Sequence, residues 1–113
     1  MTIVAGNGSS GYVDGPGQMA EFDGPQALAL DPQGNLIVTE ESNPRIRRID
    51  TAGNVTTLAG NGQHGDADGT GGVNGTAQFI SPQGVAVDDV CNVYVADRFA
   101  NRIRQISFGA PPP

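Results

Sequence analysis

The stretch Met1-Thr-Ile-Val-Ala-Gly-Asn-Gly8 recurs 54 residues later as Val55-Thr-Thr-Leu-Ala-Gly-Asn-Gly62. Asp14-Gly15 matches Asp68-Gly69 at the same offset. Self-similarity at a fixed period is the sequence signature of a repeat architecture, in which each repeat forms one supersecondary unit. The chain therefore contains an internal repeat, and we expect its fold to be built from copies of one unit.

The repeat continues after three extra residues, 72–74, which change the offset to 57. Ala20-Glu-Phe-Asp-Gly-Pro-Gln26 matches Ala77-Gln-Phe-Ile-Ser-Pro-Gln83, and Arg45-Ile-Arg-Arg-Ile49 matches Arg102-Ile-Arg-Gln-Ile106. Two residues at aligned positions of the two copies are repeat mates. The similarity covers nearly the whole chain, so coincidence does not explain it.

Each copy is predicted to form short β-strands. They lie at residues 27–31, 36–40, 45–50 and 55–59 in the first copy, and at residues 84–88, 93–97 and 102–107 in the second. Their β-branched centres, with turn sequences such as Asp31-Pro-Gln-Gly34 between them, suit the hairpins of a four-stranded antiparallel sheet. The first strand alternates small with branched side chains, as expected of a crowded inner strand of a propeller blade.

Composition favours the same all-β fold. Seventeen Gly and eight Pro among 113 residues, without a sustained 3.6-residue apolar period, predict no helix longer than one turn. The length suits one small domain. No apolar run reaches membrane-spanning length and no signal-peptide pattern is present, so we expect a soluble chain with no membrane partner.

Charge and cysteine content exclude several classes of site. The formal net charge is −6 and all six basic residues are Arg, which argues against a nucleic-acid partner. The single cysteine, Cys91, excludes an intramolecular disulfide framework and a multi-cysteine metal site. No phosphate loop or nucleotide motif is present, and no cofactor or metal is expected.

The repeated strand motifs resemble the NHL repeat. The resemblance rests on Pro82-Gln-Gly-Val-Ala-Val-Asp88, Asn92-Val-Tyr-Val-Ala-Asp97 and Asn101-Arg-Ile-Arg104, with a similar run in the first copy. The Ala-Gly-Asn-Gly…Asp-Gly stretch is similar to the long-loop variety of large extracellular and bacterial proteins. The first copy departs from the pattern at Glu40-Glu-Ser-Asn-Pro44. The resemblance implies two blades of a β-propeller, and an extracellular location or a larger secreted parent would fit it.

Propellers of this family usually have six blades, so the resemblance implies a homotrimer that completes one ring. In this interpretation residues 1–113 are a two-bladed fragment with repeats at about 5–58 and 59–107 and a tail at 108–113. Residues 2–5 would supply the fourth strand of another copy's last blade, as a strand-exchange closure; two or four chains per ring remain alternatives. The residues expected at that closure are Thr2, Ile3, Val4, Ala5, Arg102, Ile103, Arg104 and Ile106.

The long connections at residues 6–24 and 60–81 are expected on one face, beside the turns at residues 42–43 and 99–100. Rigid scaffolds place function on such loops, so this loop face could dock a protein or glycan partner; packing over the blade junction is the alternative. The candidate binding residues are Asn7, Asp14, Asn61, His64, Asp66 and Asp68. A calcium loop at residues 65–69 is less favoured than a plain turn, because a third ligand and a closing Glu are missing.

The resulting function is a non-enzymatic scaffold module that binds itself and a loop-face partner. The alternatives are a propeller hydrolase or lyase with an axial metal, and an engineered or excised fragment without a natural activity. The sequence offers no nucleophile–base–orienter set, so no catalytic residue is expected.

Three structural expectations accompany this function. Arg45, Arg47, Arg102 and Arg104 should pair with Glu40 and Asp97 across adjacent strands; an anion- or RNA-binding face is the alternative. Phe22 and Phe79 should be equivalent buried anchors. Cys91, the repeat mate of Gly34, should be a free thiol in the hairpin opposite the loop face.

Overall fold

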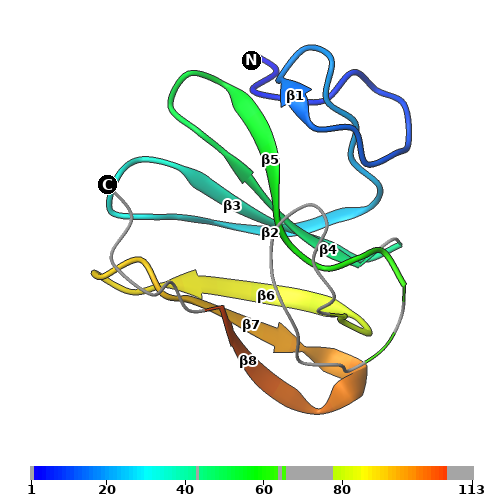
Figure 1. Cartoon of the computed structure of the whole chain (residues 1–113), viewed down its shortest axis with the longest axis vertical. Coiled ribbons are helices and arrows are strands. Elements are labelled where there is room, and N and C mark those ends of the chain that lie inside the picture. Colours follow the sequence, from blue (N-terminus) through cyan, green and yellow to red (C-terminus); the bar gives the residue numbers. More distant parts are fainter. Residues whose placement is uncertain (1, 43, 64, 66–77, 107–113) are drawn as a thin grey trace.

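The computed structural model describes residues 2–42, 44–63, 65 and 78–106 and shows an all-β chain of two antiparallel sheets (Figure 1). The first sheet has the strand order β1-β5-β4-β3-β2, and the second has the order β6-β7-β8. A single 3-10 turn, η1 (Arg98–Ala100), is the one helical element among the described residues. The strands are β1 (Gly15–Pro16), β2 (Pro25–Leu30), β3 (Leu36–Glu40), β4 (Arg45–Ile49), β5 (Asn54–Ala59), β6 (Pro82–Val87), β7 (Val93–Asp97) and β8 (Arg102–Ile106).

The predicted strands are confirmed, with small differences at their ends. β3 and β7 have the predicted bounds, whereas β2 and β6 each begin two residues earlier, at a proline that is tolerated as the first residue of a strand. β2 stops before Asp31 because that carboxylate accepts N–H groups of the turn. Its Oδ1 lies 2.9 Å from Gln33 N and 2.8 Å from Asn35 N. The two-residue strand β1 lies inside the long 6–24 loop and pairs with β5; this strand was not predicted.

The second repeat builds the same hairpin turn between β6 and β7. Asp88 Oδ1 accepts N–H groups from Val90 at 3.0 Å and Asn92 at 2.9 Å. Cys91 has a φ of 68° in this turn, where its repeat mate Gly34 has a φ of 90°. The predicted hairpin position of Cys91 is therefore confirmed. The thiol is free but buried, because the residue is only 7% exposed.

The main core lies between the two sheets. It joins Ile37, Ile46 and Ala59 of the first sheet to Phe79, Val93 and Val95, and each of these residues is at most 2% exposed. β6 packs against β2 and β3 (Figure 1). The two sheets thus bury one face each against the other, as adjacent blades of a propeller would.

A second, smaller cluster lies on the opposite face of the first sheet. It contains Ala20, Val38, Ile49 and Val55, and half-buried residues such as Phe22 pack against it. The predicted burial of Phe79 is confirmed, whereas Phe22 is only half-buried. The difference has a plain cause. Phe79 lies in the core between the two sheets, whereas Phe22 belongs to the 6–24 loop and packs at the edge of the smaller cluster.

Candidate assembly surfaces and loop face

A buried ion pair fixes the loop end of the first sheet. Arg47 Nη1 on β4 lies 2.6 Å from Glu40 Oε1 on β3, and neither side chain is exposed. The other carboxylate oxygen, Glu40 Oε2, accepts the Asp23 N–H at 2.6 Å. Arg47 Nη1 also donates to the Glu21 carbonyl at 2.9 Å. Charge-assisted hydrogen bonds of this kind hold the 6–24 loop onto the strands.

Asp14 extends this ion pair into the loop. Its Oδ1 lies 2.9 Å from Arg47 Nη2. Thr57 on β5 donates to the same carboxylate through its hydroxyl at 3.0 Å and its N–H at 3.1 Å. Asp14, predicted as a binding residue, thus has its carboxylate engaged by Arg47 and Thr57.

The second sheet repeats the arrangement on the repeat mates of these residues. Arg104 Nη1 lies 3.4 Å from Asp97 Oδ2 and donates to the Gln78 carbonyl at 3.0 Å. Asp97 Oδ1 accepts the Ser81 N–H at 2.7 Å. The predicted pairing of Arg47 with Glu40 and of Arg104 with Asp97 is confirmed. Each pairing Arg also stacks on the repeat's phenylalanine, Arg47 at 4.9 Å from the Phe22 centroid and Arg104 at 5.1 Å from that of Phe79.

Burial and hydrogen bonding shift several carboxyl pKa values in opposite directions. Desolvation raises the pKa of Glu40 above its ordinary value, and the nearby Arg47 only partly opposes it. Burial also acts to raise the pKa of Asp31, but hydrogen bonds from Asn35 and Gln33 outweigh it and leave the pKa lowered. For Asp50, the backbone hydrogen bond from Asn54 lowers the pKa most. Of these three carboxyl groups only Glu40 has a raised pKa, and its side chain is fully buried.

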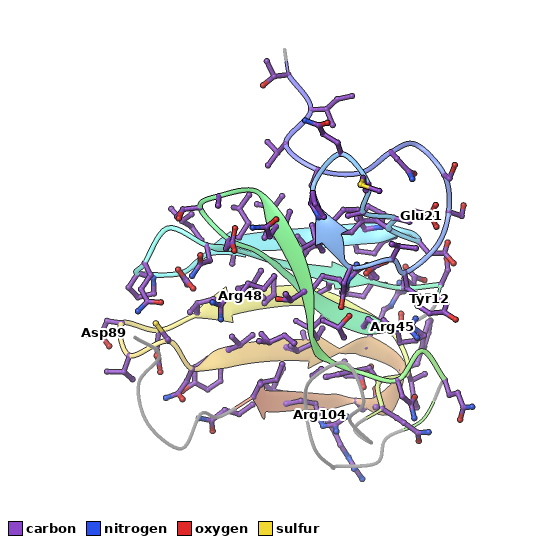
Figure 2. All side chains as sticks on the ribbon, turned by 45° about the horizontal axis from the view of Figure 1, so that its top comes forward. Tyr12, Glu21, Arg45, Arg48, Asp89 and Arg104 are labelled. Carbon is purple, nitrogen blue, oxygen red and sulfur yellow. The ribbon has the colours of Figure 1, made fainter. Side chains whose placement is uncertain are left out.

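The loop end and the hairpin end of the strands lie on opposite sides of the molecule. Figure 2 shows Tyr12, Glu21 and Arg45 gathered at one end and Asp89 at the other. The guanidinium of Arg45 lies 3.9 Å from the centroid of the Tyr12 ring, and that tyrosine remains 58% exposed. The loop end therefore presents an aromatic side chain held in place by a cation–π contact.

The other predicted loop residues lie at this end too, where they are described. Asn7 is exposed and donates to Glu21 Oε2 at 3.1 Å. Asn61 is half-buried, and its Oδ1 accepts the Gln63 N–H at 3.0 Å. His64, Asp66 and Asp68 fall outside the described residues. No group of three or more His, Cys, Asp or Glu side chains that could hold a metal occurs within the described ranges.

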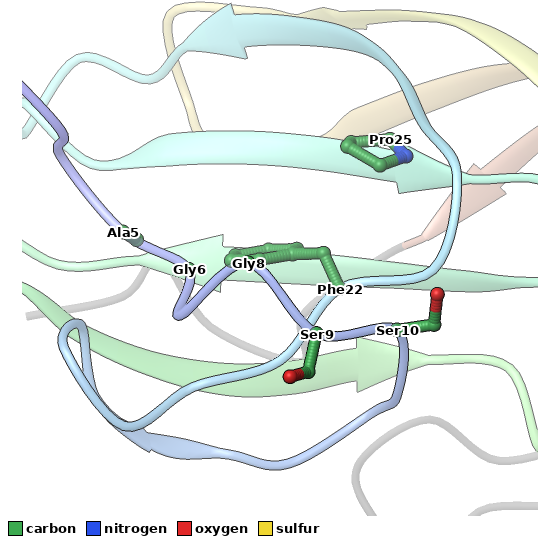
Figure 3. A pocket seen from close by; sticks show the side chains of 7 residues that line it. All are labelled: Ala5, Gly6, Gly8, Ser9, Ser10, Phe22 and Pro25. Carbon is green, nitrogen blue, oxygen red and sulfur yellow. The ribbon is translucent and has the colours of Figure 1, made fainter.

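A pocket of about 260 Å³ opens beside the 6–24 loop (Figure 3). The Phe22 ring and Pro25 are apolar residues of its lining, and Ser9 and Ser10 are polar ones (Figure 3). The whole lining is Ala5, Gly6, Gly8, Ser9, Ser10, Phe22 and Pro25. This pocket was not predicted from the sequence, because the pocket forms where residues 5–10 meet Phe22 and the start of β2 at Pro25.

The predicted strand-closure residues form two separate surfaces. Residues 2–5 lie outside the sheets, with Ile3 84% and Val4 62% exposed. β8 is an edge strand that pairs only with β7 among the described strands, and its Ile103 is 74% exposed. Figure 1 shows the N-terminal segment on the side of the molecule opposite β8. The structure thus does not bring the two sets together within one chain.

Two apolar side chains on the first sheet are exposed, which was not predicted from the sequence. Leu28 and Leu30 on β2 are each 64% exposed. Their repeat mates, Val85 and Val87 on β6, pack against the core between the sheets. The small-and-branched alternation of this strand in the sequence already carried that signal, since it places Leu28 and Leu30 on one face.

Within the described residues, no helix is long and apolar enough to cross a membrane. No protein-family model matches the chain. A curated relative, Protein SUPPRESSOR OF QUENCHING 1, chloroplastic, from Arabidopsis thaliana, is 39% identical over 97 residues. That alignment covers 82% of this chain and 9% of the relative.

Solved structures from Bacteroides share the fold. An auxiliary nutrient binding protein from Bacteroides thetaiotaomicron is 29% identical with a TM-score of 0.78, over 94% of this chain and 28% of that one. One from Bacteroides ovatus is 26% identical with a TM-score of 0.72, over 88% of this chain and 26% of that one. A third, from B. thetaiotaomicron and named as a candidate phosphatase, is 28% identical with a TM-score of 0.75, over 93% and 26%. The chain is therefore similar in fold to about a quarter of each of these larger Bacteroides proteins.

Proposed function

We propose that this chain is a non-enzymatic binding module of the NHL-repeat type, which assembles into a closed β-propeller and presents a loop face to a partner. Two of the similar solved structures are named as nutrient binding proteins, which is consistent with a binding module. The family's usual six blades, with two sheets per chain, correspond to three copies in one ring.

One observation carries the assembly part of this proposal. Each sheet buries one face against the other sheet. On its exposed face, each sheet carries residues whose repeat mates are buried in the core between the sheets. Ile46 is 0% exposed in the core between the sheets, whereas its mate Ile103 is 74% exposed. Leu28 and Leu30 are exposed on the first sheet, whereas their mates pack in that core. The exposed face of the second sheet thus carries the mates of residues that the first sheet buries, and the exposed face of the first sheet carries the mates of residues that the second sheet buries. These two faces can therefore pack against each other between copies, head to tail. Such a contact forms a closed ring when the rotation between copies allows it.

The chemistry of the described side chains favours binding over catalysis. The best-placed charged groups, Arg47, Glu40 and Asp14, are used to anchor the loop, and no cluster with the composition of a metal site accompanies them among the described residues. The loop face instead offers the exposed Tyr12 ring, and the hydrogen-bonded pair of Asn7 and Glu21 belongs to the same loop. An exposed aromatic ring together with amide and carboxylate groups suits a glycan or peptide partner, because it combines apolar area with directed hydrogen bonds.

Native mass spectrometry of the full chain in the presence of Ca²⁺, Mg²⁺ and Zn²⁺ tests the non-enzymatic part. We expect an assembly mass without any stoichiometric ion. One tightly held ion per assembly would instead support the alternative of a propeller hydrolase with an axial metal.

The docking part is tested with an oligosaccharide array and a displayed peptide library. Binding should fall at least tenfold in Tyr12→Ala and remain in Val90→Ala, which changes an exposed apolar residue at the hairpin end. Equal binding by both variants would remove the loop face from the proposal.

A further inference from the structure

The pocket beside the 6–24 loop has a filled counterpart in the second repeat. Its walls include Ala5, Phe22 and Pro25, and the repeat mates of these residues are Ala59, Phe79 and Pro82. All three mates are buried. Ala59 and Phe79 share the core between the sheets with Ile46 of β4. The equivalent place in the second repeat is therefore occupied by the chain itself.

The start of β4 occupies that place. A Cβ on Gly60 would lie 2.6 Å from the Pro44 carbonyl oxygen, and one on Gly62 would lie 2.6 Å from the Arg45 guanidinium. Arg45 also donates through Nη2 to the Asn61 carbonyl at 3.2 Å. This glycine turn is thus closely covered by residues 44–46.

The glycine turn of the first repeat has the same backbone shape without that cover. Gly6 and Gly8 have φ values of 102° and 90°, and their mates Gly60 and Gly62 have values of 96° and 84°. A Cβ on Gly8 would have no heavy atom of the described residues within 4 Å. The glycine turn at the open pocket therefore already has the conformation of its mate in the filled site. A group that binds in the pocket needs to order this turn little.

We propose that the start of β8 of a second copy, residues 101–103, fills this pocket. These residues are the repeat mates of residues 44–46. Ile103 takes the place of Ile46 against Ala5 and Phe22, and Arg102 covers Gly8 and donates to the Asn7 carbonyl as Arg45 does to Asn61. We assign a second copy of this chain as the occupant because each contact repeats, on the repeat mates, a contact that residues 44–46 make within one chain.

The pairing of β4 with β5 also fixes a strand register for the contact. Ile46 lies opposite Ala59, a bulge follows, and Arg47 and Arg48 lie opposite Thr57 and Thr56. Transferred to the mates, Ile103 of one copy lies opposite Ala5 of the next, Arg104 opposite Ile3, and Gln105 opposite Thr2. The exposed edge of β8 then gains the neighbour that an edge strand requires.

This inference rests on the assembly proposed above, and a cross-linking experiment separates the two. In a Cys91→Gly background, Thr2→Cys and Gln105→Cys are combined in the full chain. Directly opposed strand residues have Cβ atoms close enough for a disulfide. We expect covalent multimers under mild oxidation, at least tenfold more abundant than in the control pair Val4→Cys and Gln105→Cys, which is out of register by two residues.

A second measurement tests the pocket itself. Ile103→Asp should lower the assembled fraction at least tenfold by sedimentation, whereas Val90→Asp, a matched change at an exposed apolar residue of the hairpin end, should leave it unchanged. An assembled wild type with no preference for the Thr2 and Gln105 pair, or an unaffected Ile103→Asp variant, would overturn this contact and leave the assembly standing. A wild type that does not self-associate would overturn both.

Discussion

Arg47 and Glu40 lie on adjacent strands of the first sheet with Nη1 and Oε1 2.6 Å apart, and both side chains are fully buried. Their repeat mates Arg104 and Asp97 make the corresponding pair at 3.4 Å in the second sheet. In the first sheet the pair also binds the 6–24 loop, because Arg47 donates to the Glu21 carbonyl and Glu40 accepts the Asp23 N–H. The position of this loop therefore depends on the pair.

The first prediction concerns Glu40. We expect Glu40→Gln to lower the free energy of unfolding by about 2 kcal/mol, because a glutamine amide has one acceptor oxygen, whereas Glu40 uses one oxygen for Arg47 and the other for the Asp23 N–H. Urea unfolding at a fixed chain concentration measures this loss. Asp89→Asn changes an exposed carboxylate at the hairpin end and should cost less than about 0.5 kcal/mol. Equal losses in the two variants would show that the pair does not stabilise the fold.

The second prediction concerns Phe79, which is 2% exposed in the core between the sheets. Phe79→Ala should destabilise the chain by about 3–5 kcal/mol, since it removes a large buried ring and leaves a cavity. Phe99 is 62% exposed, so Phe99→Ala serves as the control and should cost less than about 0.5 kcal/mol. Denaturant midpoints of the two variants compare them. A loss below about 1 kcal/mol for Phe79→Ala would place the ring outside the core.

The third prediction concerns acid stability. The pKa of Asp31 is lowered in the folded chain from its ordinary 3.8, so the unfolded state binds a proton first as the pH falls. Its contribution to stability is complete above pH 3.8 and is lost as the pH falls through the folded value. The raised pKa of Glu40 acts in the opposite sense, and its contribution falls as the pH rises above 4.5.

The variant Asp31→Asn separates these two effects. Below pH 3.8 its denaturant midpoint should change less with pH than that of the wild type, because the titrating group has been removed. Above pH 4.5 the two profiles should run parallel, since Glu40 is present in both. Identical slopes in the acid range would mean that the turn hydrogen bonds of Asp31 do not lower its pKa.

The fourth prediction concerns the thiol of Cys91. Desolvation raises its pKa, and the nearby carboxylates of Asp31 and Asp88 raise it further. Because the thiolate is the reactive form, a thiol reagent should label the folded chain at least tenfold more slowly than the urea-unfolded chain at pH 8. Asp31→Asn should speed labelling of the folded chain, because one of the negative charges that raise the thiol pKa is gone. Labelling at the unfolded rate would contradict the buried position.

The strand pattern was predictable from the sequence because it rests on local signals. Turns with proline, glycine and aspartate separate the strands, and the 57-residue offset between mates relates β2, β3 and β4 to β6, β7 and β8. The Arg47 and Glu40 pair could also be predicted, since the two residues lie on the neighbouring strands β4 and β3. Cys91 could be placed in its turn because it aligns with Gly34.

The remaining features depend on contacts that strand pattern does not encode. β1 pairs with β5 only after the 6–24 loop has folded back, and Asp14 reaches Arg47 and Thr57 through that same fold. The unequal burial of Phe22 and Phe79 reflects which face a second sheet covers. These features follow from the relative placement of the loop and the two sheets.

Sedimentation equilibrium of the full chain over a range of concentrations tests the central claim most directly. The proposed ring predicts a species of three times the chain mass of 11.6 kDa, stable on dilution to micromolar chain. Assemblies of two or four chains would contradict the six-bladed closure while retaining contact between copies. A single species of 11.6 kDa that unfolds cooperatively would contradict self-assembly altogether.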